Sequence, residues 1–165
     1  MARSVHQFEL FHGIVLTKLV RNPKPITLRM IETNVTAAWA LYTINGDVSL
    51  LIKSSKRPKD KKKQESHTWQ FTFTPDDLAK LRKLKGAIHV ALVCGDETVT
   101  TDWMQVCLIE ANELNKMIDL GASTQQTIRV TYTPPQKKLR VKGTTSADDC
   151  LVNRSRLDKW DVPGA

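Results

Sequence analysis

Residues 39–53, WALYTINGDVSLLIK, decide the fold, because two apolar runs flank a tripeptide that suits a tight chain reversal. Asn45 and Gly46 readily take the positive φ angles of such a turn, so the two runs are predicted to pair as a β-hairpin. Asp47 is then expected to be the third residue of the turn.

The sequence on either side of this hairpin changes between helical and strand periodicity. Apolar side chains at helical spacing predict an amphipathic helix over residues 8–21, and alternating side chains predict a strand over residues 26–33. After the hairpin, residues 67–74 place three aromatic side chains on one face, which predicts a half-buried antiparallel strand. Residues 74–77, TPDD, have the cap hydroxyl, the proline and the acids typical of a helix start, and Gly86 ends that helix.

Further elements complete a small single domain. They are strands over residues 87–94 and 103–109, a short helix over 111–120, and a hairpin of residues 127–133 and 137–142. The predicted fold class is α/β (α+β): a mixed, largely antiparallel sheet flanked by helices, in the order α-β-β-β-β-α-β-β-α-β-β. Little periodicity remains after Gly143, so residues 1–143 are expected to form one globular domain and residues 144–165 an irregular or weakly ordered tail.

Length and composition fit one globular domain of 165 residues, with 41% hydrophobic and 25% charged residues. Cys94, Cys107 and Cys150 are widely spaced and lack the spacing of zinc ligands, so a reducing cytoplasm is expected. No apolar run approaches the ~20 residues needed to cross a bilayer, and the first residues lack the apolar core of a secretory signal. The sequence therefore predicts a soluble, cytoplasmic protein.

A basic segment follows the hairpin directly. Residues 53–63 hold seven Lys or Arg and one acid, Asp60, so this segment contributes +6 of the +8 net charge of the chain. A concentrated positive field attracts polyanions, with nucleic acid the first partner to consider and an anionic membrane surface the second; a solvated loop is the alternative. The candidate phosphate contacts in this segment are Lys53, Lys56, Arg57, Lys59, Lys61, Lys62 and Lys63.

A second basic strip lies in the last predicted hairpin. Arg140 and Lys142 should project from one face of their strand while Leu139 and Val141 occupy the other, which adds both cations to the candidate nucleic-acid contacts. The remaining members of the strip are Arg129, Lys137 and Lys138.

The aromatic side chains after the basic segment have two interpretations. Trp69, Phe71 and Phe73 are either a platform on which unpaired bases stack or part of the core. Three bulky residues at strand spacing favour the core, because burial of each contributes a few kcal/mol. The nucleic-acid hypothesis therefore depends on charge more than on stacking.

Lys53 also has a second interpretation, which comes from the order of the elements around it. The order helix, three meandering strands, helix, strand over residues 5–110 resembles the core of the PD-(D/E)XK nuclease superfamily, in which a motif lysine lies near the end of the third strand. The resemblance implies two carboxylates that hold Mg²⁺ or Mn²⁺ beside this lysine, so that the metal polarises a phosphate and activates water. The family's second acid should lie two residues before the lysine, where this chain has Leu51, so the resemblance implies an incomplete metal site.

Two acids are candidate ligands for a metal in such a site. Glu32 ends a strand that leads into a bend, and Glu9 on the first helix is placed to approach the same end of the sheet. Asp47 is excluded, because six residues of regular strand separate its α-carbon from that of Lys53 by about 20 Å. Glu32 and Lys53 are thus the candidate catalytic residues, and Glu9 and Glu32 the candidate metal ligands.

The leading hypothesis from the sequence is a small nucleic-acid-binding protein with a nuclease-like layout and no cofactor, which is not expected to be catalytic. One alternative is an active nuclease that uses Mg²⁺ or Mn²⁺. The other is a protein-interaction module or homo-oligomer, joined by a sheet edge or an apolar face, without a nucleic-acid role.

Overall fold

The computed structural model describes residues 7–34, 37–55, 66–84, 86–96 and 104–163. Within them the chain forms three helices and nine strands, in the order α1 (Gln7–Val20), β1 (Leu28–Asn34), β2 (Trp39–Ile44), β3 (Val48–Ser55), β4 (His67–Phe73), α2 (Pro75–Arg82), β5 (Ile88–Cys94), β6 (Gln105–Ile109), α3 (Ala111–Met117), β7 (Gln126–Tyr132), β8 (Lys138–Gly143) and β9 (Cys150–Asn153). The predicted order of elements is confirmed from α1 to β8, and β9 is added at the end.

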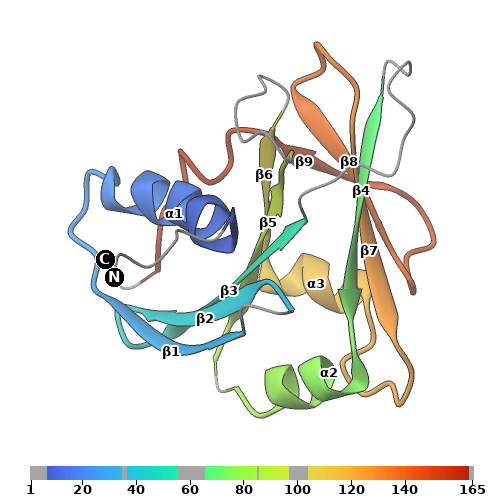
Figure 1. Cartoon of the computed structure of the whole chain (residues 1–165), viewed down its shortest axis with the longest axis horizontal. Helices are drawn as coiled ribbons and strands as arrows, with labels where there is room; N and C mark the ends of the chain where they lie inside the picture. The colour runs from blue at the N-terminus through green and yellow to red at the C-terminus, as the bar shows by residue number, and fades with distance from the viewer. Residues whose placement is uncertain (1–6, 35–36, 56–65, 85, 97–103, 164–165) are drawn as a thin grey trace, which may run out of the picture.

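Two β-sheets face each other and divide the strands between them (Figure 1). Sheet A has the order β1-β2-β3-β5-β6, and sheet B has the order β4-β7-β8-β9. All neighbouring strands are antiparallel except β3 and β5, which are parallel. The predicted α+β class with mixed, largely antiparallel pairing is therefore confirmed. The single predicted sheet becomes two, because β4 with its aromatic face pairs with β7.

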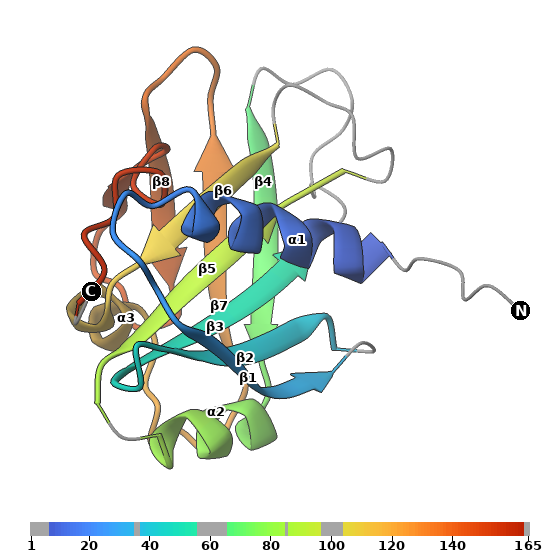
Figure 2. The ribbon, with the colours of Figure 1, turned by 90° about the vertical axis from the view of Figure 1, so that its left-hand side faces the viewer.

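Sheet A is the middle layer of the molecule. α1 and the chain after β9 cover one of its faces, and sheet B with α2 and α3 covers the other (Figure 1, Figure 2). β3 and β5 are consequently buried on both faces, which explains their nearly uninterrupted apolar sequences. Leu51 packs in the core shared with sheet B, while Leu50 and Ile52 pack in the core next to α1.

The hairpin around Asn45 and Gly46 is formed by β2 and β3. Ile44 pairs with Val48, and Asn45 and Gly46 between them have φ angles of 52° and 76°. Asp47 is the third residue of this turn, as predicted. The turn fixes the register of both strands, and with it the face to which each side chain points.

The aromatic face of β4 belongs to the core. Trp69, Phe71 and Phe73 are buried in the layer between the two sheets. The indole Nε1 of Trp69 donates a hydrogen bond of 2.9 Å to the carbonyl of Gly95. The core interpretation is confirmed, and these rings do not face outward from sheet B.

The C-terminal chain corrects the prediction of an irregular or weakly ordered tail over residues 144–165. Cys150–Asn153 forms β9 against β8, and three apolar side chains beyond it are buried: Leu157, Trp160 and Val162. A four-residue strand and a turn-rich segment are too short to show a period in the sequence. Their order comes instead from contacts with distant parts of the chain.

Two buried histidines lie on the α1 side of sheet A. Nε2 of His12 on α1 forms a hydrogen bond with the hydroxyl of Tyr42, and the ring centre of His89 lies 5.0 Å from that of Trp160. Burial lowers the pKa of both histidines, and two nearby carboxylates offset part of this effect at His89. Both imidazoles are therefore neutral at neutral pH, and in that form they join α1 and the C-terminal chain to sheet A.

We expect the free energy of unfolding to fall as the pH drops below about 6.5, the ordinary pKa of histidine. In that range the unfolded chain binds protons that the folded chain, with its lowered histidine pKa values, binds only at lower pH. Each residue then contributes up to about 1.4 kcal/mol per pH unit. Urea unfolding between about pH 5.5 and about pH 7.5 measures this slope. The His12→Gln/His89→Gln variant should flatten it, and an unchanged slope would contradict the role given to these residues.

Candidate nucleic-acid interface

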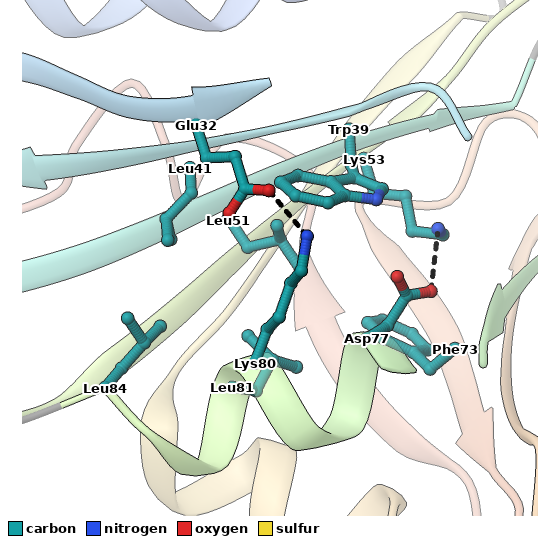
Figure 3. Close-up of a pocket in the computed structure, with 10 residues that line it drawn as sticks. All are labelled: Glu32, Trp39, Leu41, Leu51, Lys53, Phe73, Asp77, Lys80, Leu81 and Leu84. Atoms are coloured by element: carbon teal, nitrogen blue, oxygen red, sulfur yellow. Dashed lines mark hydrogen bonds and ion pairs between the residues drawn. The ribbon is translucent and has the colours of Figure 1, made fainter. Parts of the chain in front are cut away.

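Lys53, the lysine on which the nuclease resemblance depends, is buried near the end of β3. Its side chain lies between sheet A and sheet B, and 7% of the residue is exposed. Nζ lies 3.9 Å from Oδ2 of Asp77 and 5.5 Å from the centre of the Phe73 ring (Figure 3). Burial lowers the pKa of Lys53, and the Asp77 carboxylate offsets part of that effect. The interpretation of Lys53 as the first residue of a solvated loop is therefore wrong.

The local sequence explains this burial. β3 continues through Ser55 in parallel pairing with β5, so Lys53 is an interior strand residue opposite Leu92. Asp77 reaches it from the first turn of α2, where the backbone N–H of Thr74 donates to Asp77 Oδ2 at 3.0 Å and that of Asp77 donates to Thr74 Oγ1 at 3.2 Å. The sequence analysis missed Asp77 as a partner of Lys53, although the TPDD helix start marks it as a capping residue.

Glu32 lies beside the same pocket but has a different partner. It is an exposed residue of β1, and its Oε1 accepts a hydrogen bond of 2.5 Å from Nζ of Lys80 on α2. That ammonium also lies 4.9 Å from the centre of the Trp39 ring (Figure 3). Glu9, the other candidate ligand, is on α1 at the opposite side of sheet A, so the structure does not bring the two acids together.

The pocket that contains Glu32 and Lys53 is small and balanced in charge. Its charged members are two acids and two lysines, and its other walls are apolar: Trp39, Leu41, Leu51, Phe73, Leu81 and Leu84. A cavity volume of about 20 Å³ gives room for about one water molecule. In the parts of the chain that the structure describes, no group of three or more His, Cys, Asp or Glu side chains is arranged to hold a metal ion. The pocket therefore lies where α2 packs against sheet A. The nuclease alternative stays a prediction.

The outer face of sheet B brings the second basic strip together. On β8 the buried and exposed residues alternate as predicted, and the exposed ones are Lys138, Arg140 and Lys142. Arg129 is exposed on the neighbouring strand β7. Among the described residues, no helix or strand covers this face (Figure 1).

These four cations, which we call the cationic face, have no acid among them. The other outward positions of the four strands hold uncharged residues: Thr68, Gln70, Thr72, Thr127, Thr131, Leu151 and Asn153. Within the described chain, none of the four cations forms an ion pair. Arg129 lies directly opposite Lys142 in the antiparallel register, and a like-charge pair in this position destabilises a sheet. We therefore expect this pair to lower the stability of sheet B.

The described chain resumes after the basic segment at one end of the cationic face. Residues 56–65 lie outside the described residues, and with them six of the candidate phosphate contacts: Lys56, Arg57, Lys59, Lys61, Lys62 and Lys63. The described chain resumes at Ser66, whose Oγ lies 2.7 Å from Oγ1 of Thr133, close to the turn that leads into Lys138. Ser66, the first described residue after the basic segment, therefore lies at the end of sheet B where β8 begins.

Comparisons with protein-family models, curated proteins and solved structures gave no match for this chain. Within the described residues, no helix combines the length and the apolar character needed to cross a membrane. The geometry and charge of the site are therefore the basis for assigning a function.

Substitutions in the Lys53 pocket should distinguish the contribution of helix capping to the free energy of unfolding from that of the buried charge pair. We expect Lys53→Met to leave the free energy of unfolding unchanged or to raise it, because a buried pair held at 3.9 Å repays little of its desolvation. Asp77→Ala should lower it by about 2 kcal/mol or more, since it removes the capping box and leaves Lys53 without a counter-charge. Thr74→Ala, which removes only the cap, should cost about 1 kcal/mol.

Urea unfolding of the three variants measures these differences. A Lys53→Met variant as unstable as Asp77→Ala would show that the lysine charge itself stabilises the fold.

Proposed function

We propose that this protein binds nucleic acid through the cationic face of sheet B, by contacts between its cations and the phosphate backbone. The observation that carries the proposal is the unbalanced charge of that face, which has four cations on two neighbouring strands, no acid, and a like-charge pair in register. A polyanion laid across the face would supply the missing negative charge and release its own counterions.

The composition of the face favours backbone contact over base recognition. Lys and Arg side chains bind phosphates, and the threonine hydroxyls and glutamine amide on the same face are further donors to phosphate oxygens. The three aromatic rings of β4 point into the core, so they provide no stacking platform on this face. Binding should therefore depend weakly on nucleotide sequence and steeply on salt.

The basic segment over residues 56–63 extends the same proposal. Six of its cations, within residues 56–63, lie outside the described part of the chain, which resumes at Ser66 beside the start of β8. These cations have the same sign as the cationic face, so both add to the attraction of the protein for a polyanion.

An anionic membrane surface offers the same kind of charge as nucleic acid. Leu151 is the one large apolar side chain exposed on the outer face of sheet B within the described chain. The face therefore lacks the cluster of apolar anchors with which surface-bound proteins enter the lipid. Nucleic acid fits this face better, and lipid vesicles serve as the control.

Removal of two cations from the face should weaken binding and reduce its salt dependence. We expect Arg140→Gln/Lys142→Gln to bind a fluorescein-labelled oligonucleotide about tenfold more weakly at low salt, with the slope of log K against log salt smaller in magnitude by about 1.4 to 1.8. Fluorescence anisotropy measures both quantities. The matched control is Arg82→Gln/Lys83→Gln, which removes two exposed cations from the end of α2.

Two results would count against the proposed function. Equal losses in the face variant and the α2 control would mean that net charge alone attracts the nucleic acid. Tighter binding to phosphatidylserine vesicles than to oligonucleotides would identify a membrane surface as the partner.

Removal of one cation from this face should stabilise the folded protein. Lys142→Thr removes one member of the like-charge pair with Arg129 and places a β-branched residue on β8. We expect the free energy of unfolding without nucleic acid to rise by about 0.2 to 1 kcal/mol, measured by urea unfolding at low salt. A loss of stability would show that Lys142 has a stabilising role, and the cost assigned to the cationic face would be wrong.

A further inference from the structure

A polar groove lies beside the cationic face, at the junction of α1, the edge strand β6 and the chain after β9. Its cavity volume of about 650 Å³ is in the range that holds a nucleotide-sized ligand. Residues from all three elements line it, among them Lys18, Gln105 and Arg154. The sequence analysis missed this groove because its walls come together only when the C-terminal chain packs beside α1.

The groove is positively charged. Its charged residues are four cations and one acid: Lys18, Lys137, Arg154, Lys159 and Asp158. Asp158 is engaged by Lys18, at 2.7 Å between Oδ1 and Nζ. The other three cations form no ion pair with an acid of the described chain, so the groove is suited to negative charge from a ligand.

Arg154 is held in position for an anion. Its guanidinium lies 4.6 Å from the centre of the Tyr132 ring, its Nε donates to Oε1 of Gln105 at 2.8 Å, and its Nη1 donates to the carbonyl of Gln136 at 3.5 Å. Gln105 is itself buried, so its amide is a fixed anchor. Nη2 has no acceptor among the described residues, so a guanidinium that is held through Nε and Nη1 keeps N–H groups that can donate to a phosphate oxygen.

The groove continues the cationic face around a corner of the molecule. Lys138 on the face lies opposite Asn153, and Asn153 lines the groove together with Lys137. α1, which forms another wall, lies on the other side of sheet A from sheet B (Figure 1, Figure 2). A ligand chain that occupies both surfaces therefore has to bend between them.

We propose that this groove binds the phosphodiester backbone of a single nucleic-acid strand that continues from the cationic face, with Arg154 as a phosphate ligand. The bend selects the strand type, because duplex DNA is stiff, with a persistence length of about 50 nm, whereas a single strand turns within a few nucleotides. The inference rests on the proposed function and makes its ligand more specific, since single strands should bind in preference to duplexes.

The test compares single strands and duplexes in variants of the groove. The probes are a labelled oligothymidylate of about 24 nucleotides, long enough to occupy both surfaces, and a duplex of the same length. We expect Arg154→Gln/Lys159→Gln to weaken single-strand binding about tenfold relative to the Arg82→Gln/Lys83→Gln control, with a salt slope smaller in magnitude by about 1.4. Binding of the duplex should change no more than it does in the control.

A second variant keeps the test valid if the loss of Arg154 alters folding. Lys137→Gln/Lys159→Gln removes two exposed ammonium groups that have no hydrogen-bond partner among the described residues. It should weaken single-strand binding without lowering the unfolding temperature. Loss of single-strand affinity in both groove variants supports the inference.

Four results would overturn the inference. If the groove variants match the control while Arg140→Gln/Lys142→Gln loses affinity, the groove is outside the interface and the proposed function stands. If the groove variants weaken duplex and single strand equally, the groove does not select a bent strand. If no variant changes binding, the proposed function fails together with the inference. If millimolar AMP displaces the strand and binds less tightly to Arg154→Gln, the groove belongs to a free phosphorylated ligand.

Discussion

Sheet A has to be covered on both faces, and the layout of the protein follows from that requirement. β3 and β5 carry apolar side chains on both sides, and their parallel pairing places them inside the sheet. Burial of this surface stabilises the fold by roughly 25 cal/mol for each Å² of apolar area. α1 and the C-terminal chain close one face, and sheet B with α2 and α3 closes the other.

Sheet B is an outer layer in this arrangement, so one of its faces remains open to solvent. Its strands accordingly alternate between core side chains and polar side chains. The outward positions are free of packing demands, and on β7 and β8 several of them hold cations without acids. A face that served solubility alone would mix both signs, because opposite charges across neighbouring strands stabilise a sheet. The single sign of the charge is therefore what makes this surface a candidate interface.

Features that arise from neighbouring residues were predictable from the sequence. The Asn45-Gly46 turn, the aromatic face of β4, the start of α2 and the alternation of β8 each depend on a few consecutive positions. The two sheets, the burial of Lys53 and the packing of the C-terminal chain depend on contacts between distant residues. A lysine at the end of an apolar run is typical of a solvated loop unless its distant partner Asp77 is known. The groove around Arg154 was hidden for the same reason, because three separate segments build it.

The charged regions of the protein differ in charge balance. The pocket around Lys53 pairs cations with acids, whereas the cationic face and the groove carry an excess of cations. Around Lys53 the charges are partly buried, each of the two lysines lies next to an acid, and the group joins α2 to sheet A. A buried charge without a partner costs several kcal/mol, so balance in that pocket is a condition of folding. Solvent screens the cations of the outer face and of the groove, so folding does not require that they be balanced. Unbalanced charge of one sign on two adjoining surfaces, with a guanidinium already fixed by Gln105 and Tyr132, is better explained by a ligand than by the needs of the fold.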